Sequence, residues 1–155
     1  MAQERLRELF GYHIDGWLIR RRTGKRIVCT LTKGQRYLRL FVDGKVHRLH
    51  RMIYIWHYGI PVNNIDHIDN NRENNRIENL RQATQQENCI NRKHHTNSKS
   101  PYKNVYWNEA ANKWAVSMCV NKVRKYFGIF EDVELADLVA SEARDKFQGQ
   151  FARHY

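Results

Sequence analysis

The sequence predicts an α+β fold built from two modules, each of which combines short antiparallel strands with a helix. Two sets of short β-rich runs, separated by turn residues, occupy residues 17–49 and 102–130. A capped or amphipathic helical segment follows each set. With 155 residues and 41% hydrophobic content, the chain can bury one ordinary core or two small ones.

The strongest global signal is the net charge of +11, with an isoelectric point near 9.8. Such a charge favours a polyanionic partner, either nucleic acid or an anionic membrane. Basic residues concentrate in residues 1–60 and 91–130, where they alternate with aromatic and β-branched residues and form no one-faced amphipathic helix. We therefore favour nucleic acid; the simpler alternative is a basic surface that only keeps the protein soluble.

In the first module, the runs at residues 17–21, 26–32, 36–42 and 45–49 predict three or four antiparallel strands. Asp43-Gly44 between the last two is typical of a type I′ hairpin turn. The segment HRMIYIWHYG, residues 50–59, predicts a short buried helix that ends at Gly59 and Pro61. Residues 1–15 match no pattern.

The next segment predicts the order strand, loop, strand and helix, a ββα arrangement. NIDHI (residues 64–68) and LRQA (residues 80–83) read as strands, separated by a polar loop. Thr84 and Glu87 form a capping box at the start of the helix. Asp66 and His67 therefore lie on the first strand, Asn79 ends the loop, and Asn88 lies about one turn inside the helix.

These four residues can form a site. Adjacent residues on a strand point to opposite faces, so Asp66 can hold a metal on one side while His67 activates water on the other. A helix packed across the strands can bring Asn88 Oδ1 to the same metal, and oxygen ligands favour Mg²⁺ or Mn²⁺. The plain alternative is that Asp-His is a chance dipeptide and the asparagines fill turns.

The stretches DHIDNNRENNRIENL and TQQEN, with their spacing, resemble the HNH homing endonucleases with the ββα-metal motif, particularly those of phages. The resemblance implies that Asp66 and Asn88 are metal ligands and that His67 is the general base. It also implies that Asn79 pins the loop and orients His67, and that cleavage leaves 3′-hydroxyl and 5′-phosphate ends. The three cysteines lie far apart, so no structural zinc is expected.

A basic linker without apolar residues is predicted at residues 93–100. After it, residues 102–108, 113–120 and 123–130 predict three strands, with a tight turn at Asn121-Lys122. A helix over residues 133–147, capped by Asp132, follows. Its apolar stripe, with which we expect it to cover the inner face of the sheet, consists of Leu135, Val139, Ala143 and Phe147.

Residues 101–152 resemble the plant ethylene-response-factor DNA-binding domain through YKNVYW, KWAV and YFGIFEDVELA. The resemblance implies that the sheet binds in the DNA major groove, where an arginine can pair with guanine. Arg124 and Tyr126 match DNA-contacting positions of that family, whereas Tyr106 and Asn108 replace its arginines. Together with Ser117, these four residues form the predicted polar face.

The sequence thus predicts a metal-dependent, sequence-recognising HNH DNA endonuclease of the homing type. We expect residues 1–92 to form the nuclease domain, with its motif at about 62–92, and residues 101–155 the DNA-recognition domain. Further contacts to DNA are expected from basic residues of the first module and the linker: Arg20, Arg21, Arg36, Arg39, Lys93 and Lys99.

The expected partner is double-stranded DNA, bound by a monomer or a transient dimer, with Mg²⁺ or Mn²⁺ and no small-molecule cofactor. The sequence contains no long apolar run and no basic flank before an apolar secretory segment, so we expect no membrane association and a cytoplasmic location. Two alternatives remain open: a DNA-binding regulator that does not cleave, and an RNA-binding protein that uses its aromatic residues for stacking.

Overall fold

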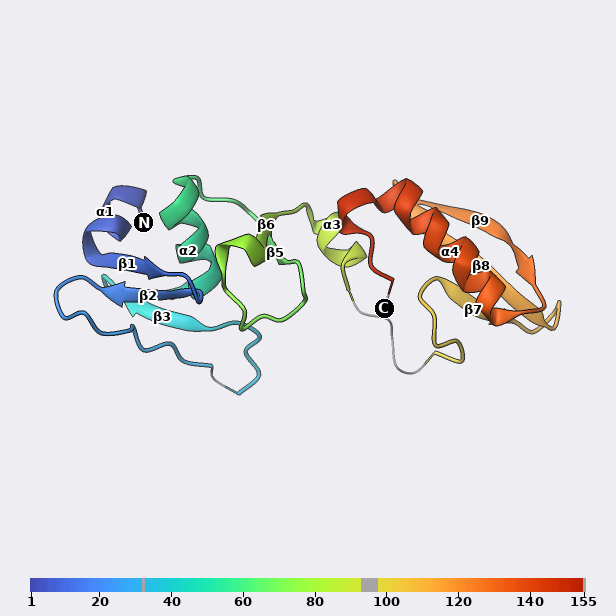
Figure 1. The fold of residues 1–155 in the computed structure, drawn as a ribbon, viewed down its shortest axis with the longest axis horizontal. Helices are drawn as coiled ribbons and strands as arrows, with labels where there is room; N and C mark the ends of the chain where they lie inside the picture. Colours follow the sequence, from blue (N-terminus) through green and yellow to red (C-terminus); the bar gives the residue numbers. More distant parts are fainter. Residues whose placement is uncertain (32, 93–97, 155) are drawn as a thin grey trace. The chain divides into compact units, whose positions relative to one another are not determined.

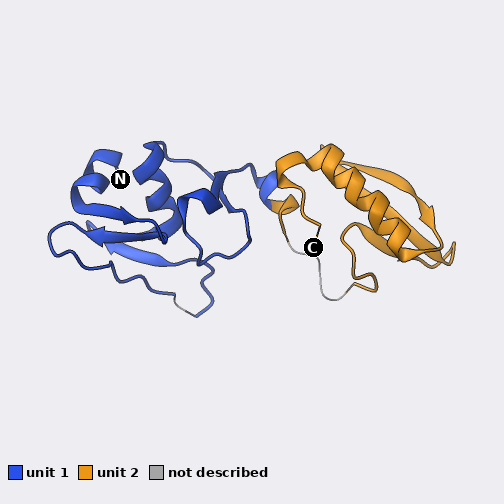
Figure 2. Cartoon of the chain, viewed as in Figure 1, with its two compact units in different colours: residues 1–88 blue, residues 89–155 orange. Residues whose placement is uncertain are grey.

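The structure, a computed structural model, describes residues 1–31, 33–92 and 98–154. It forms two compact units, residues 1–88 and 89–155, which are coloured separately in Figure 2. Both combine antiparallel strands with helices, so the predicted α+β class is confirmed. Lys93 and most of the predicted linker lie outside the described residues. None of the described helices has the length and apolar character that a membrane span requires.

Unit 1 begins with helix α1 (Gln3–Leu9), which leads directly into strand β1 (Phe10–His13). β1 pairs antiparallel with β2 (Trp17–Arg20), so that Phe10 lies opposite Arg20 and His13 opposite Trp17 (Figure 1). Of these elements, the sequence predicts only β2. β1 contains Gly11 and no β-branched residue, so its sequence carries little strand signal until its partner is known.

The prediction of a strand over residues 26–32 is wrong for residues 26–31, the part of it that the structure describes. The segment forms only two isolated bridges, Ile19 to Arg26 and Thr30 to Arg39. Ile27 is buried in the core, but Val28 is 81% exposed. The segment bridges β2 at Arg26 and β3 at Thr30, so it passes from one strand to the other before a continuous ladder forms.

The hairpin predicted around Asp43-Gly44 is confirmed. Strands β3 (Arg39–Val42) and β4 (Lys45–Arg48) pair antiparallel. Asp43 and Gly44 have φ angles of 47° and 76°, the left-handed values that a type I′ turn requires at both central positions. β3 is shorter than the predicted run of residues 36–42.

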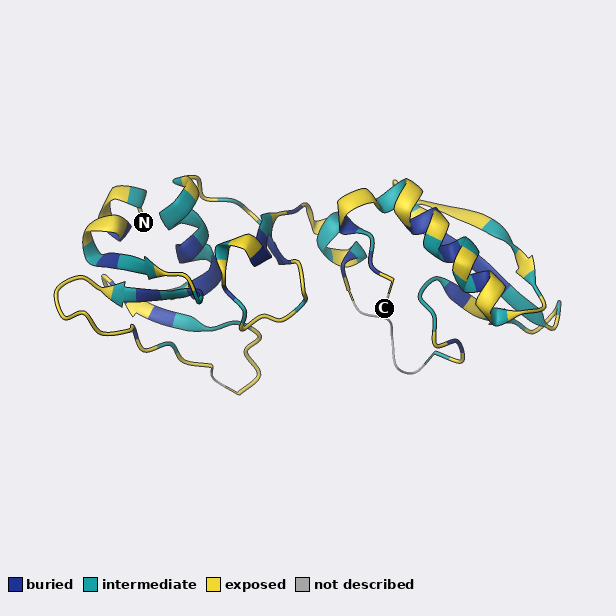
Figure 3. Cartoon of the chain, viewed as in Figure 1, coloured by how far each residue is buried: buried dark blue, intermediate teal, exposed yellow. Residues whose placement is uncertain are grey.

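Helix α2 (Leu49–Tyr58) follows, as predicted, and ends at Gly59, whose φ of 74° is left-handed. Its buried side chains pack into a core to which helices and strands of the whole unit contribute (Figure 3). The buried residues of this core are Leu6, Phe10, Leu18, Ile27, Leu40, Val42, Leu49, Met52, Ile53, Ile65 and Leu80.

The last part of unit 1 has the predicted order of strand, loop, strand and helix. Strand β5 (Ile65–His67) pairs antiparallel with β6 (Leu80–Gln82), which follows the short 3₁₀ helix η1 (Ile77–Asn79). Helix α3 (Gln85–Ile90) comes next. The capping box is present: Glu87 N donates to Thr84 Oγ1 at 3.2 Å, and Thr84 N donates to Glu87 Oε2 at 2.6 Å. The capping box therefore fixes the beginning of α3 after a connection of two residues, Ala83 and Thr84.

Unit 2 contains a three-stranded antiparallel sheet and a helix that covers one of its faces (Figure 1). The strands are β7 (Val105–Asn108), β8 (Lys113–Val120) and β9 (Val123–Phe130), with β8 in the centre. Helix α4 (Val133–Gln148) begins at Asp132, whose side chain accepts hydrogen bonds from Glu134 N and Leu135 N. The short 3₁₀ helix η2 (Gly149–Phe151) follows. Strands β8 and β9 and the helix agree with the prediction, whereas β7 is shorter than the predicted run of residues 102–108, because residues 102–104 form a bend and a turn.

The apolar stripe predicted for this helix is wrong at Leu135 but confirmed at Ala143, which is buried, and at Phe147, whose ring centroid lies 5.8 Å from that of Phe127 in β9. Leu135 is 50% exposed, while Ala136, Ala140 and Ala143 are buried. Ala136 and Ala140 pack against Val105 and Val116 of the sheet. Their small side chains allow the helix to lie close to the strands, so the packing face follows residue size as well as hydrophobicity.

Candidate functional site

Asp66 and His67 lie next to each other on β5, and both side chains are buried. In the β5–β6 ladder, Asp66 lies opposite Arg81 and His67 opposite Leu80. Arg81 Nε and one of its terminal nitrogens lie 2.9 and 2.8 Å from Asp66 Oδ2. The carboxylate is therefore held by a charged partner on the neighbouring strand.

The ring of His67 is fixed by Asn75, a fully buried residue of the loop between β5 and β6. His67 Nε2 lies 3.2 Å from Asn75 Oδ1. Asn75 Nδ2 donates to Glu73 O at 2.9 Å, which orients the amide so that its oxygen faces the histidine. His67 Nε2 must then carry the proton, and Nδ1 is the unprotonated nitrogen of the neutral ring.

His67 lies among other aromatic rings. Its ring centroid is 6.0 Å from that of Tyr37 in a stacked arrangement and 5.2 Å from that of His50. Burial lowers the pKa of His67, although the hydrogen bond with Asn75 and the nearby carboxylate of Asp69 oppose this shift. The ring is therefore neutral at neutral pH.

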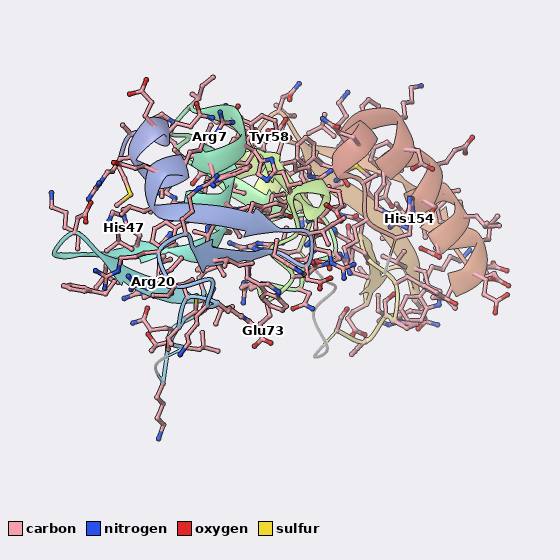
Figure 4. The ribbon with its side chains drawn as sticks, turned by 60° about the vertical axis from the view of Figure 1, so that its left-hand side comes forward. Arg7, Arg20, His47, Tyr58, Glu73 and His154 are labelled. Atoms are coloured by element: carbon pink, nitrogen blue, oxygen red, sulfur yellow. The ribbon has the colours of Figure 1, made fainter. Side chains whose placement is uncertain are left out.

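Asn79 closes the loop between β5 and β6. Its Oδ1 accepts from Asp69 N at 3.0 Å, and its Nδ2 donates to Asp69 Oδ1 at 2.9 Å and to Asn74 O at 2.8 Å. Burial alone would raise the pKa of Asp69, but hydrogen bonds, among them those from Asn74 and Asn79, outweigh it and lower the pKa. Glu73 lies exposed on the same loop (Figure 4). Asn79 thus pins the loop that carries Asn75.

The hairpin of β1 and β2 supports this loop from another side. Tyr12 Oη accepts from Ile77 N at 3.0 Å, and Asp15 pairs with Arg76 at 2.7 Å. Gly16 has a φ of 85°, and a Cβ atom at this position would lie 2.5 Å from Arg76 N. The close approach of hairpin and loop therefore requires glycine here.

Asn88 lies in the second half of the short helix α3, where its backbone N–H donates to Thr84 O at 3.0 Å. Together with Asp66 and His67 it lines a cavity of about 30 Å³. The other lining residues are Tyr37, Ile65, Asn70 and Arg72. The structure thus brings together three of the four residues predicted for the site, and Asn79 supports them through the loop.

A groove of about 320 Å³ adjoins this cavity. The groove and the cavity share Asn70 and Arg72, and Arg36 lines the groove as well. The guanidinium carbon of Arg72 lies 5.6 Å from the centroid of Tyr37. Of the arginines predicted to contact DNA, Arg36 therefore lies near the site.

The donor set suits a hard divalent cation. Asp66 and Asn88 supply a carboxylate and an amide oxygen to a cavity of about 30 Å³, large enough for one water-sized particle. No group of three or more His, Cys, Asp or Glu side chains that could hold a metal occurs in residues 1–31, 33–92 and 98–154. Mg²⁺ needs only one or two protein ligands when water and phosphate complete its coordination. These residues therefore fit Mg²⁺ or Mn²⁺.

Comparison with known protein families identifies this region. Residues 47–89 match the family model of the HNH endonucleases. The match includes Asp66, His67, Asn79 and Asn88 and supports an HNH nuclease domain in this part of the chain. No curated protein and no solved structure matches the chain.

Four residues of the candidate site are not predicted from the sequence: Tyr37, Arg72, Asn75 and Arg81. Only Arg81 carries a usable signal, because pairing the two predicted strands around their loop places it opposite Asp66. Tyr37 lies in an irregular segment before β3, and Asn75 lies in the loop between β5 and β6. Neither segment has a periodic sequence pattern that would predict its contact with His67.

The outer face of the sheet in unit 2 carries the other predicted residues. Cross-strand pairing places Tyr106 beside Ala115, Ala115 beside Ile129, Ser117 beside Tyr126, and Cys119 beside Arg124. Tyr106, Arg124 and Tyr126 are exposed, but Ser117 is only 6% exposed, because it lies on the central strand next to a register shift. Its predicted place on an accessible surface is therefore wrong.

The remaining predicted residues have these surroundings. Asn108 Oδ1 accepts from Ala111 N, and Lys99 pairs with Glu109. Arg21 donates to Arg7 O at 2.6 Å, and Arg39 donates to Gln35. Arg20, labelled in Figure 4, lines a groove of about 450 Å³ that is formed by residues of α1, β1, β2 and β3 and of the turns after β2 and β3, and that does not include His67.

Replacing Gly16 by alanine tests the link between the hairpin and His67. We expect Gly16→Ala to lower the free energy of unfolding by more than the roughly 1–2 kcal/mol that a left-handed backbone costs a residue with a Cβ. The added atom would also displace Asn75 and change the imidazole nitrogen chemical shifts of His67. Gly24→Ala is the control, because Gly24 has a φ of 66° but no atom near its Cβ position. Equal decreases in the free energy of unfolding of Gly16→Ala and Gly24→Ala, measured in urea, would contradict this expectation.

Replacing His50 by phenylalanine tests the cost of burying this imidazole. Burial, and to a smaller extent the charges of His67 and Arg48, lower the pKa of His50 to about 3. Below pH 6.5 the unfolded chain binds a proton that the folded chain does not, so stability falls as the pH falls from 6.5 towards 3, by up to about 1.4 kcal/mol per pH unit. Urea unfolding of His50→Phe should show a shallower decline than the wild type. The exposed residue His13 serves as control, and a decline in His50→Phe as steep as in the wild type would argue against the assignment.

Proposed function

We propose that this protein is a metal-dependent DNA endonuclease that cuts a phosphodiester bond at the cavity lined by Asp66, His67 and Asn88. The observation that carries the proposal is the convergence of these three side chains on one cavity within the segment that matches the HNH endonucleases. A nuclease function in general is supported by the match itself. The metal, the nature of the nucleic acid and the products are our proposals.

Asp66 and Asn88 would hold the divalent cation, with Asp66 approaching from β5 and Asn88 from α3. Mg²⁺ or Mn²⁺ would neutralise charge on the phosphate and on the leaving oxygen. The capping box serves this arrangement, because it fixes the beginning of α3 and thus the position of Asn88 along the helix.

His67 would act as general base. Its Nε2 proton is bonded to Asn75, so Nδ1 accepts the proton from the attacking water. The water oxygen forms a bond to phosphorus while the bond from phosphorus to the 3′ oxygen breaks, and the leaving oxygen takes up a proton. The products are a 3′-hydroxyl and a 5′-phosphate. Asn79 is a positioning residue in this scheme, because it holds the loop that carries Asn75.

Double-stranded DNA is the proposed substrate. The net charge of +11 favours a polyanion. In unit 1, the groove that adjoins the cavity contains Arg36 and Arg72, which suit a phosphate backbone. In unit 2, the sheet face opposite α4 carries Arg124 and the exposed aromatic residues Tyr106 and Tyr126. We propose that this face reads the target sequence, as in the ethylene-response-factor domains that residues 101–152 resemble.

The proposal also covers the wider setting. A homing-type activity encoded by a phage follows from the resemblance of the motif, and a monomer or transient dimer on DNA would suit a single HNH site in each chain. We expect the protein to act in the cytoplasm, without a small-molecule cofactor.

Relaxation of supercoiled plasmid tests the nuclease. With Mg²⁺ or Mn²⁺ at low salt, the wild type should nick or linearise the plasmid, and EDTA should stop it. His67→Ala should lower the rate by at least about a hundredfold, the usual contribution of a general base. DNA affinity in gel shifts should remain unchanged, since His67 is only 5% exposed and offers little surface for contact with DNA.

His13→Ala is the matched control, because it removes an exposed histidine of the same unit. Cleavage that persists in His67→Ala would exclude His67 as the base. Tight DNA binding without cleavage by the wild type on any substrate would instead favour the regulator, and stronger binding to RNA than to duplex DNA would favour the RNA-binding protein.

Replacing Arg124 and Tyr126 by alanine tests the division of labour between the units. We expect the double variant to bind its target sequence about tenfold or more weakly, since one good arginine contact to a base contributes about 1–3 kcal/mol. Non-specific nicking of plasmid should change little. Lys122→Ala, on the turn between β8 and β9, serves as control. Unchanged selectivity among target sequences would remove unit 2 from sequence recognition.

A further inference from the structure

The contact between Asp66 and Arg81 is the starting point. Both side chains are removed from solvent, with exposures of 4% for Asp66 and 16% for Arg81. The two residues lie directly opposite each other on β5 and β6. Two guanidinium nitrogens approach the same carboxylate oxygen, Oδ2, at 2.8 and 2.9 Å. The pairing of β5 with β6 thus places the guanidinium group of Arg81 against Asp66, the proposed metal ligand.

A buried carboxylate needs a positive partner, because an unpaired charge out of water is strongly unfavourable. In the folded protein without metal, Arg81 is that partner. A divalent cation at Asp66 would bring a second positive charge to the same carboxylate, and the two cations would repel each other. Binding of the metal and pairing with Arg81 therefore compete.

The surroundings of Asp66 strengthen this competition. Among the residues that line the cavity, Asp66 is the only acidic one, and Arg72 adds another guanidinium group. Without nucleic acid, the cavity is thus lined by one carboxylate and one guanidinium group, and a second guanidinium group, that of Arg81, already pairs with this carboxylate. A phosphate would reverse this balance, because it brings negative charge and because a guanidinium group pairs as well with phosphate as with carboxylate.

Resting on the proposed function, we propose that Arg81 couples metal binding to substrate binding. Arg81 holds Asp66 in the free protein and moves to a phosphate when nucleic acid enters, which leaves Asp66 to the metal. The site then binds its metal weakly in the absence of nucleic acid and tightly in its presence. By reciprocity, the metal raises the affinity for nucleic acid by the same factor.

Titration with Mn²⁺, followed through the loss of the electron paramagnetic resonance signal of the free ion, tests this coupling. All proteins carry His67→Ala so that DNA remains intact, and each is titrated with and without a short DNA duplex. With Arg81 present, the duplex should tighten Mn²⁺ binding by about tenfold or more, within the usual range of coupling between sites. With Arg81→Gln, Mn²⁺ should bind about tenfold more tightly without DNA, and the duplex should add little.

Arg76→Gln is the control, because Arg76 pairs with Asp15, a carboxylate that is not a proposed ligand. Arg76→Gln should have the same Mn²⁺ affinity as the parent, both with and without the duplex. A second readout follows from linkage: Mn²⁺ should raise the melting temperature of Arg81→Gln more than that of the parent, since the metal replaces the lost partner of Asp66.

The outcomes separate the two proposals. If Arg81→Gln binds Mn²⁺ no more tightly than the parent, Arg81 does not compete with the metal and the inference is overturned. If Arg81→Gln fails to fold, equal Mn²⁺ affinities of the parent with and without DNA overturn it as well. If no protein binds Mn²⁺ even with DNA, the proposed metal site itself is wrong, and the inference fails with it.

Discussion

The pairing of β5 with β6 is the constraint on which the site depends. Only three residue pairs form this ladder, yet they set Asp66 opposite Arg81 and His67 opposite Leu80. Neighbouring side chains on a strand point to opposite faces, so a shift of the register by one residue would exchange the surroundings of Asp66 and His67. Ile65 and Leu80 resist such a shift, because both are buried in the core of unit 1.

The site is made of polar groups, and their hydrogen bonds keep them in place. Asn79 and Asp69 join the two ends of the loop, and Asn75 is held at Glu73 O while it contacts His67. Buried amides without partners would destabilise the fold, whereas a connected network fixes one conformation. This explains why the segment is so rich in asparagine: the short amide side chain bonds to the backbone and tolerates turn conformations, as Asn70 does with a φ of 60°.

Local signals in the sequence were sufficient for much of this arrangement. The capping box of Thr84 and Glu87, the Asp43-Gly44 turn and the Asp132 cap each act within a few residues, and each is found as predicted. The β5–β6 hairpin followed from its apolar residues on either side of a polar loop. The connection between β6 and α3 is short and leaves the backbone little conformational freedom. Asn88 therefore lines the same cavity as Asp66 and His67.

Features that depend on distant partners were not predictable. β1 exists because β2 pairs with it, and residues 26–31 fail to form a strand because no neighbouring edge continues along them. The packing face of α4 follows the shape of the sheet, which selects alanines over Leu135. Asn75 and Tyr37 could not be assigned to His67, because contacts made by irregular segments leave no periodic pattern.

The position of the unit boundary has a consequence for how such a chain can be recombined. The division between Asn88 and Cys89 falls inside α3, a helix of only six residues. A chimera that exchanged everything from Cys89 onwards would replace the last two residues of this helix, Cys89 and Ile90, together with the rest of unit 2. A graft that joins after Ile90 would keep the whole helix in its original sequence. The segment that can be exchanged without altering α3 therefore begins at residue 91, two residues after the start of unit 2.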